Sequence, residues 1–307
     1  MNTMSVFCPL CQSPVSLIGS IADACSFAGR SLDSPLSGGY LYQCLHCHLN
    51  FRWPQLTKDS LDALYKGGND KIAWHYVPSQ RKDWTITKTI IQNATECIKV
   101  LDVGCFDGAF LSFLGQEYER YGIEIHPAAY SRAEAAGVTM IARDLEDIKD
   151  IDRLFDCVIS MDVVEHVADP LNFLGKLVGV TKPGGKIILS TGNTDSWSWK
   201  IAGSRYWYCQ IAEHISFINP MWCNYAAQEI GLSVKQISTF SHKNASVARR
   251  IKELAINLAY LSFPAVGRLL RKKGVGGINM RKFPTLADVP PGWHSAHDHL
   301  LVVFQKP

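Results

Sequence analysis

Long apolar runs and an excess of one charge are both missing from this 307-residue sequence. No stretch of about 18 apolar residues is free of charged ones, so we expect no transmembrane helix. The first nine residues have neither a basic start nor an apolar run, which argues against a secretory signal peptide. A net charge of +3 is too small by itself to indicate a nucleic-acid-binding protein. These absences predict a cytoplasmic protein whose ten cysteines stay reduced.

The charge that is present is unevenly placed. Ten Lys or Arg residues and one acid, Glu253, stand between Lys243 and Lys282, so this segment carries +9 and leaves −6 for the rest. Apolar residues recur there at helical spacing, namely Ile251, Leu254, Leu258 and Leu261. Three interpretations stay open. The segment is a lid helix packed on its own domain, a basic amphipathic helix peripherally associated with the inner membrane surface, or, less favoured, a contact for RNA phosphates.

Four of the ten cysteines form two CxxC pairs, Cys8 with Cys11 and Cys44 with Cys47. Two thiolates separated by two residues can bind one metal ion from a tight turn, and two such turns complete a tetrahedral zinc site. The interval between the pairs holds a loop or an extra strand, and Ser31–Gly39 has the composition of a loop. A redox CxxC would occur once, at a strand-to-helix turn. We therefore predict a structural zinc site, with His46 and His48 as less favoured substitute ligands.

Apolar strand-like runs alternate with helical stretches from about residue 98 onward, which predicts crossover helices and a parallel sheet. Buried parallel strands read as continuous apolar runs, and these do. The expected strands are residues 98–103, 120–125, 138–142, 156–161 and 186–191, followed by 232–239 and 299–305.

The loop after the first strand contains two glycines and two acids. Gly104 and Gly108 allow a sharp turn and a close approach of backbone to ligand. The spacing is not the G-x-G-x-x-G of pyrophosphate sites, and Asp102 and Asp107 would repel a pyrophosphate. They suit a ligand with a cationic sulfonium and an amino group. Glu124 ends the second strand, where a carboxylate can accept hydrogen bonds from a ribose diol.

Further motifs follow in a fixed order. Asp144-Leu145 comes after the third strand, Glu165-His166 after the fourth, and a Lys-Pro-Gly-Gly turn at 182–185 before the fifth. In this order the motifs resemble those of class I S-adenosylmethionine (SAM)-dependent methyltransferases, in the branch that includes ubiquinone-biosynthesis and sugar or natural-product enzymes. The resemblance covers residues 98–240 and 299–305.

The resemblance implies an α/β fold with a Rossmann-like seven-stranded sheet, here with a small N-terminal zinc-binding module and a helical insert before the last strand. We expect a zinc-ribbon-like module at 1–55, a helical connector at 56–97 and a methyltransferase domain at 98–307, with the insert at about 243–298. The implied cofactor is SAM. The residues implied to bind it are Asp102, Gly104, Asp107, Gly108, Glu124, Asp144, Leu145 and Asp162.

Two histidines are candidates for removing a proton from the acceptor, His166 after the fourth strand and His214 after the fifth. In ubiquinone-type relatives an acid-x-x-Glu-His cluster is a proposed divalent metal site, which implies Asp162, Glu165 and His166 here. Asp162 has a shorter reach than the commoner Glu. The aromatic residues between 197 and 222 either wall the acceptor pocket or pack an extra helical layer.

The sequence therefore predicts a methyltransferase for a small-molecule acceptor, such as a sugar, a nucleotide sugar, a lipid-linked glycan or a related metabolite. Whether oxygen or carbon is methylated stays open. One alternative is a ribosomal or other RNA methyltransferase, although no Asn/Asp-Pro-Pro-Tyr motif is present and residues 1–60 are not notably basic. Another is a non-catalytic module that binds SAM and interacts through its zinc site.

Overall fold

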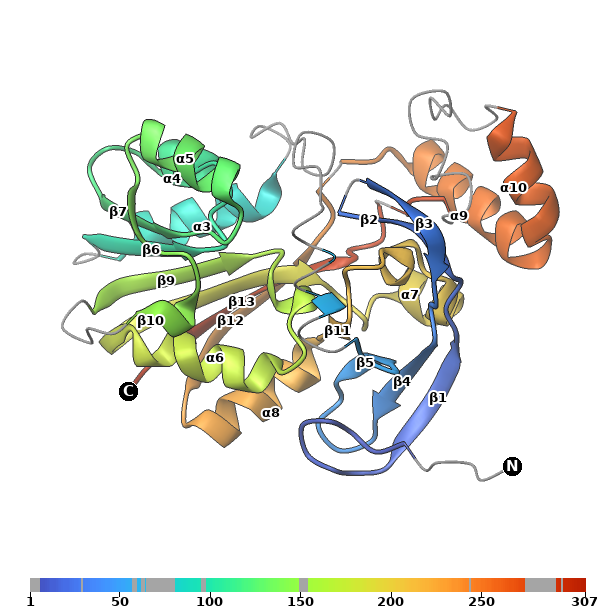
Figure 1. The fold of residues 1–307 in the computed structure, drawn as a ribbon, viewed down its shortest axis with the longest axis horizontal. Coiled ribbons are helices and arrows are strands. Elements are labelled where there is room, and N and C mark those ends of the chain that lie inside the picture. Colours follow the sequence, from blue (N-terminus) through green and yellow to red (C-terminus); the bar gives the residue numbers. More distant parts are fainter. Residues whose placement is uncertain are drawn as a thin grey trace.

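The computed structural model describes residues 6–28, 30–56, 60–61, 64, 81–94, 98–148, 154–242, 244–273, 291–293 and 295–307 (Figure 1). Most of the predicted connector lies outside these residues, and the predicted domain boundaries at 55 and 97 stay predictions. Within the described residues, no helix is both long and apolar enough to cross a membrane.

A seven-stranded sheet forms the centre of the larger part of the molecule. Its strand order is β12-β13-β10-β9-β6-β7-β8, and β13 runs antiparallel to both of its neighbours while the other pairs are parallel. This arrangement confirms the predicted Rossmann-like sheet of seven strands. The strands are β6 (Lys99–Val103), β7 (Glu119–Ile123), β8 (Thr139–Ala142), β9 (Phe155–Met161), β10 (Thr181–Gly192), β12 (Ser233–Phe240) and β13 (His299–Gln305).

Helices cover both faces of this sheet, because its inner strands are apolar on both sides. One core packs the sheet against α3 (Lys82–Gln92), α4 (Ala109–Leu114) and α5 (Pro127–Ala135). The opposite core packs it against α6 (Pro170–Gly179) and α8 (Pro220–Ile230) (Figure 1). The two helical layers leave the carboxyl ends of the parallel strands open to the loops that follow them.

The N-terminal residues form a second, four-stranded sheet of order β1-β4-β5-β11. Its strands are β1 (Val15–Ser20), β4 (Tyr40–Cys44), β5 (Asn50–Trp53) and β11 (Ser216–Phe217). β11 therefore comes from the methyltransferase-like part of the chain. The hairpin of β2 (Ala24–Phe27) and β3 (Arg30–Leu36) lies between β1 and β4 in the interval between the CxxC pairs. The loop predicted at 31–39 is thus wrong over 31–36, because strand pairing outweighs the Ser- and Pro-rich composition.

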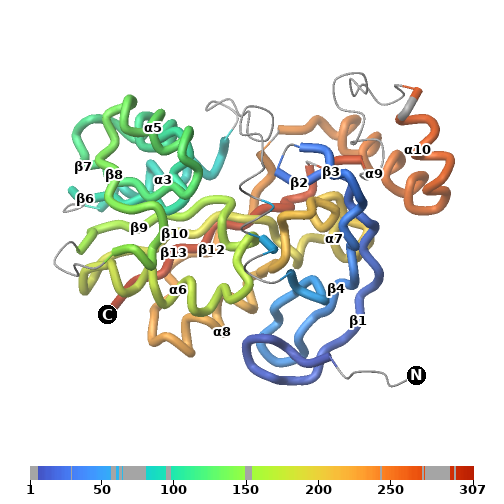
Figure 2. Tube along the Cα trace, in the orientation of Figure 1, coloured from blue at the N-terminus to red at the C-terminus, as the bar shows by residue number. Residues whose placement is uncertain are grey.

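The segment between β10 and α8 contains one α-helix and two 3₁₀ helices, α7 (Trp197–Ala202), η4 (Gly203–Arg205) and η5 (Trp207–Gln210). Two further 3₁₀ helices, η2 (Leu145–Asp147) and η3 (Val164–His166), follow β8 and β9. The insert forms two helices at the edge of the molecule, α9 (Val247–Ser262) and α10 (Pro264–Lys272) (Figures 1 and 2). β12 and β13 pair with each other across this insert, as predicted.

Candidate active site at the carboxyl edge of the sheet

The turn from β6 into α4 requires glycine at two positions. Gly104 has a φ of +80°, and a Cβ on it would lie 2.4 Å from Cγ2 of Val163. Gly108 has a φ of +74° and is the N-cap residue of α4. Glycine populates this left-handed region at no steric cost, whereas other residues rarely do. The loop can therefore bring bare backbone and the start of a helix against a ligand.

Two buried carboxylates stand at the ends of the neighbouring strands β6 and β7. Burial and the charge of Glu124 raise the pKa of Asp102 to about 7. Burial also raises the pKa of Glu124, whose two oxygens accept hydrogen bonds from the backbone N–H groups of Phe106 (2.9 Å) and His126 (2.8 Å). Those bonds orient the Glu124 carboxylate at the tip of β7. A site with two such acids favours a ligand that brings positive charge and hydrogen-bond donors.

These groups fit SAM. The glycine turn admits its methionine half, the carboxylate of Asp102 suits its ammonium and sulfonium groups, and the oriented Glu124 can accept from its ribose hydroxyls. Asp107 accepts a hydrogen bond from the backbone N–H of Ala109 (3.1 Å) and so orders the start of α4.

Two other predicted cofactor residues have structural contacts of their own. Asp144 caps η2 by accepting a hydrogen bond from the backbone N–H of Glu146 (3.1 Å), and Leu145 is half-buried beside it. Asp162 ends β9 with a φ of +54° and forms an ion pair of 2.7 Å with Arg81. A role of Asp144 and Leu145 at the adenine stays a prediction.

A polar cluster lies beside the end of β9, built from two loops that are distant in sequence. Donor atoms of Glu165, His166 and His214 lie within 4.8 Å of one another, and the two imidazole rings meet edge to face at 4.8 Å. Asp162 is outside this group, because its carboxylate is paired with Arg81. The predicted metal set of Asp162, Glu165 and His166 is therefore corrected. The structure combines Glu165 and His166 with His214 instead.

The hydroxyl of Tyr208 donates a hydrogen bond to Oε1 of the fully buried Glu165. Burial and the charge of Asp162 raise the pKa of Glu165 to about 7. Nδ1 of His214 lies 3.1 Å from the carbonyl oxygen of Tyr208. Because a carbonyl only accepts, Nδ1 carries the proton and Nε2 keeps its lone pair. Burial and the neighbouring His166 hold the pKa of His214 well below its usual range, so this imidazole is neutral.

The aromatic stretch at 197–222 supplies packing and one functional contact. Trp199, Tyr206 and Phe217 are buried in a core shared with the N-terminal sheet, and Trp222, on α8, is buried in the core between that helix and the seven-stranded sheet. Tyr208 belongs to the same core, yet its hydroxyl reaches Glu165. Of the two interpretations of this stretch, packing describes most of its members.

Sequence reasoning missed a second acid–histidine pair at the same edge of the sheet. Nδ1 of His299 lies 3.2 Å from the carboxylate of Asp298, which also accepts a hydrogen bond from the hydroxyl of Tyr206 (3.0 Å). The His299 ring meets that of His242 at 4.4 Å. β13 runs antiparallel, so its first residue lies where the parallel strands end. A polar Asp-His pair directly before an apolar last strand was the signal that could have located it.

Comparison with known proteins identifies the fold. Residues 73–237 match the family described as methyltransferase domain, which is more than half of the chain. The chain belongs to the class I SAM-dependent methyltransferase family. Among solved structures, a chain from the complex of the Haloferax volcanii Trm112 methyltransferase activator with a methyltransferase has a TM-score of 0.52 at 18% identity. The match covers 82% of this chain and 100% of that one, and it supports the fold alone.

Curated relatives that this methyltransferase matches include ubiquinone biosynthesis O-methyltransferases. That of Cereibacter sphaeroides (strain ATCC 17023) is 36% identical over 118 residues, which are 35% of this chain and 46% of the relative. The mitochondrial protein of Arabidopsis thaliana is 28% identical over 187 residues, 55% of this chain and 56% of that one. The methyltransferase thus spans about half the length of these relatives.

The N-terminal sheet of this methyltransferase holds the loop that carries Tyr208 and His214. The buried guanidinium of Arg52 donates to the carbonyl oxygens of Cys209 (2.8 Å) and Ile211 (3.0 Å). On the other side of His214, β11 pairs with β5, and the N–H of Arg52 donates to the carbonyl of Ile215 (2.9 Å). The loop is therefore held on both sides of the histidine by one strand.

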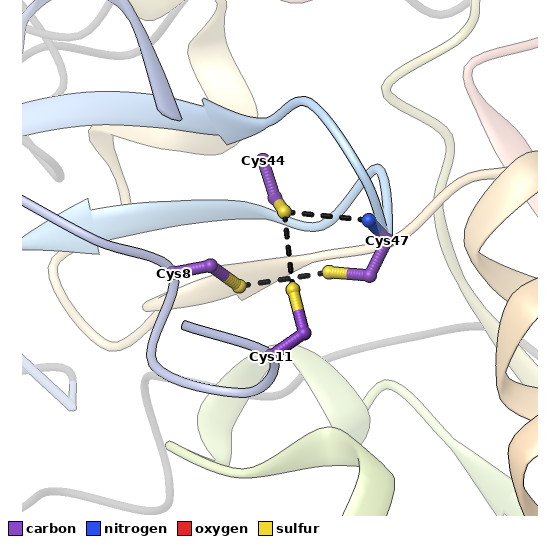
Figure 3. Close-up of side chains that lie close together, drawn as sticks. All are labelled: Cys8, Cys11, Cys44 and Cys47. Atoms are coloured by element: carbon purple, nitrogen blue, oxygen red, sulfur yellow. Dashed lines mark hydrogen bonds between the residues drawn. The ribbon is translucent and has the colours of Figure 1, made fainter. Parts of the chain in front are cut away.

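The four predicted zinc ligands come together at one end of this sheet (Figure 3). The sulfurs of Cys8 and Cys47 are 3.6 Å apart, and those of Cys11 and Cys44 are 3.4 Å apart. Four sulfurs at about 2.3 Å from a tetrahedral zinc would be about 3.8 Å from each other, so the cluster has the size of a zinc site. The contact with Cys47 lowers the pKa of the Cys8 thiol to about 5, while the pKa of Cys47 is raised by the same contact. His46 and His48 are not members of the cluster.

Proposed function

We propose that this methyltransferase transfers a methyl group to an oxygen or carbon atom of a small molecule, in the class of sugars, nucleotide sugars, lipid-linked glycans or related metabolites. Family membership and the O-methyltransferase names of the curated relatives support the reaction class. One observation carries the acceptor side of the proposal. A buried cluster of Glu165, Tyr208 and His214, in which the carboxylate and the imidazole can accept a proton, lies where β9 ends, beside the cofactor loop.

SAM, when bound, supplies a methyl group that its sulfonium already activates. The residues of this chain would hold and orient it. The backbone of the β6–α4 turn would approach its methionine half, Asp102 would attract its cationic groups, and Glu124 would accept hydrogen bonds from its ribose. The remaining task is to align the acceptor, which is mainly positioning.

The acceptor proton would pass to His214. Its ring is neutral, its Nδ1–H is held by the Tyr208 carbonyl, and Nε2 is the free base. The carboxyl group of Glu165, with a pKa raised to about 7, lies within 4.8 Å of the His214 ring nitrogen and can share the proton that His214 takes up. His166 closes the cluster on the side of the β9 loop. A divalent metal ion held by Glu165, His166 and His214 is the alternative use of these three donors, and it stays a prediction.

We also propose that Cys8, Cys11, Cys44 and Cys47 hold a structural zinc ion. All four positions of a tetrahedron are taken by thiolates, so no site is left for a substrate.

A transfer assay tests the function. Methyl-labelled SAM is incubated with the protein and an extract that is then separated into RNA, protein, lipid and small-molecule fractions. Label in the lipid or small-molecule fraction is expected, and label in RNA would favour the alternative. His214→Asn is the matched variant, because its amide can still donate to the Tyr208 carbonyl but cannot take up a proton. We expect its turnover to fall at least about 100-fold at unchanged SAM affinity, whereas unchanged turnover would remove His214 as the base.

A further inference from the structure

The insert concentrates exposed apolar side chains on one small part of the molecule. Among the described residues, eight of the nineteen large apolar side chains that are exposed lie between Val247 and Leu270, within α9, α10 and their connection. Single exposed apolar residues are ordinary, but a contiguous group on two consecutive helices marks an interaction surface. The eight are Val247, Ile251, Ile256, Leu258, Phe263, Val266, Leu269 and Leu270.

Each helix of the insert has packed apolar residues and, beside them, exposed ones. On α9, Leu254 and Leu261 pack into the core formed with the N-terminal sheet. Val247, Ile251 and Leu258 lie on the same side of this helix, in a stripe next to the packed residues, and they are 74%, 62% and 44% exposed. The contacts of Leu254 and Leu261 support the lid interpretation of the insert, but the exposed stripe takes no part in that packing.

α10 repeats the arrangement. Gly267 packs against α9, since a Cβ there would lie 2.5 Å from the ring of Tyr260. Leu269 lies on the side of α10 away from that contact, Val266 and Leu270 flank it, and all three are exposed. Phe263, 68% exposed, stands at the corner between the two helices. The exposed apolar side chains of α9, of α10 and of this corner are called the hairpin surface below.

The exposed charge around the hairpin surface is positive. Arg250, Lys252 and Arg268 are exposed, with Lys273 at the end of α10. The one acid of the two helices, Glu253, is largely buried. It is bonded to Arg249 (3.1 Å) and to Ser295, whose hydroxyl and backbone N–H both donate to it. Apolar side chains flanked by uncompensated positive ones are the pattern of a helix that lies in a membrane interface.

We propose that the hairpin surface docks this protein on an anionic lipid membrane, with the apolar side chains at the acyl boundary and the basic ones among the headgroups. α9 has 16 residues, fewer than the roughly 20 that span a bilayer, so the helices lie along the surface. RNA phosphates would attract the basic residues but would leave the apolar face in water. A second copy of the chain would cover the apolar face but would bring two positively charged rims together.

Vesicle co-sedimentation of the full chain tests this surface. We expect the protein to bind vesicles of phosphatidylcholine mixed with phosphatidylglycerol, and to bind pure phosphatidylcholine vesicles much more weakly. Ile251→Asp and Leu269→Asp should each weaken binding at least about tenfold, because a charge replaces an apolar side chain that would enter the interface. Met221→Asp is the matched control, since Met221 is equally exposed on α8, and it should leave binding unchanged.

Charge is tested in the same way. Arg268→Glu should weaken binding to the anionic vesicles by more than the roughly fivefold effect of one basic residue near such a surface. Lys235→Glu, an equally simple reversal on the exposed side of β12, should have little effect. All these positions are exposed, so the melting temperatures of the variants should match that of the parent protein, which keeps the comparison interpretable.

Three results would overturn the proposal. One is equal binding of the parent protein to anionic and neutral vesicles. Another is unchanged binding of the Ile251 and Leu269 variants. The third is an apolar contact between copies, seen as a dimer in sedimentation that Leu269→Asp converts to a monomer while vesicle binding stays absent. Salt-sensitive binding to RNA without vesicle binding would favour a nucleic-acid surface instead.

Discussion

At Gly104 the missing side chain has two consequences for the cofactor loop. The left-handed φ of +80° disfavours any L-residue, and the added Cβ would meet Val163 at 2.4 Å. Strain of this kind costs on the order of 1–3 kcal/mol. Since Val163 precedes the 3₁₀ helix with Glu165 and His166, a shift there would disturb both the cofactor loop and the polar cluster.

Gly104→Ala should therefore lower the affinity for SAM by at least about tenfold, because the strain displaces the loop that approaches the cofactor. Isothermal titration calorimetry measures this. Gly184→Ala is a matched control, since Gly184 has a similar φ of +73° but nothing within 4 Å of its added Cβ. Equal SAM affinities for the two variants would contradict the role of Gly104 in the loop.

Asp102 illustrates how a binding residue can weaken the fold that carries it. Burial and Glu124 raise its pKa to about 7, so the folded state holds a proton more tightly than the unfolded chain does. The stability that this group contributes is present below about pH 4 and is lost as the pH rises to about 7. Above that range the folded protein carries a buried carboxylate, which is the form that a cationic ligand needs.

Asp102→Asn should raise the free energy of unfolding of the SAM-free protein at pH 8 by up to about 4 kcal/mol, and by little at pH 4. The same change should abolish measurable SAM binding, while the parent protein should bind SAM more tightly as the pH passes 7. Denaturant unfolding at several pH values checks the first effect. Asp33→Asn, on the exposed side of β3, should change neither quantity. A stability gain that is the same at both pH values would count against a raised pKa at Asp102.

Among the elements, β5 connects the cysteine cluster at one end of the N-terminal sheet to the loop that carries Tyr208 and His214, called the acceptor loop below after its proposed role. It pairs with β4 on one edge and with β11 on the other, and Arg52 adds two hydrogen bonds to the carbonyls before His214. Burial lowers the pKa of Arg52, while Cys209 and Glu213 oppose that shift electrostatically. Because its buried N–H groups are donated to two carbonyls, the contact is sensitive to a change of side chain.

Arg52→Met should reduce the free energy of unfolding by about 3 kcal/mol, because two buried carbonyl groups lose their donors. Hydrogen exchange of the amides at 207–217 should accelerate more than that of β6 and β9. Arg120→Met is a useful comparison, since Arg120 also donates to a carbonyl, that of Gly137, but near solvent. It should cost no more than about 0.5 kcal/mol. Uniform acceleration over the whole chain would indicate general destabilisation rather than a local hold on the loop.

At the scale of the whole molecule, two apolar cores join what the sequence suggests are separate parts. The cysteine cluster lies in the same core as β9, β10 and α8, and a further core contains residues of β4, η5, β11 and α9. The predicted zinc module therefore does not stand apart from the methyltransferase sheet. Loss of its predicted metal should therefore loosen the acceptor loop, because β5 and β11 connect the two.

Cys44→Ser should remove the bound zinc and lower the melting temperature by several degrees, because an incomplete ligand set no longer holds the N-terminal sheet. Metal analysis by mass spectrometry should find one zinc ion per chain in the parent protein. Cys25→Ser changes an exposed cysteine outside the cluster and should keep both the metal and the melting temperature. A fully folded parent protein without zinc would refute the site.

Much of the sheet was predictable, and particular residues show why. The last strand runs from His299 to Gln305 as expected, and α9 contains the residues from Ile251 to Leu261 that recur at helical spacing. Both elements were predictable because they depend on local apolar periodicity. The cofactor loop was predictable for the same reason, since Asp102, Gly104 and Gly108 are adjacent in sequence. The partner of Asp162 was not, because Arg81 precedes it by 81 residues and only the closed fold brings their charges together.

The sequence by itself determined the class of fold, the cofactor motif and the four clustered thiols, since each rests on residues close together in the chain or on a periodicity that a strand or helix imposes. Only the tertiary structure decided which side chains share the polar cluster at the end of β9. It set His214 beside Glu165 and His166, placed the Asp298–His299 pair at the same edge, and left apolar side chains of α9 and α10 exposed. The physical reason is that these contacts depend on how strands and loops distant in sequence pack together, and no local preference encodes that packing.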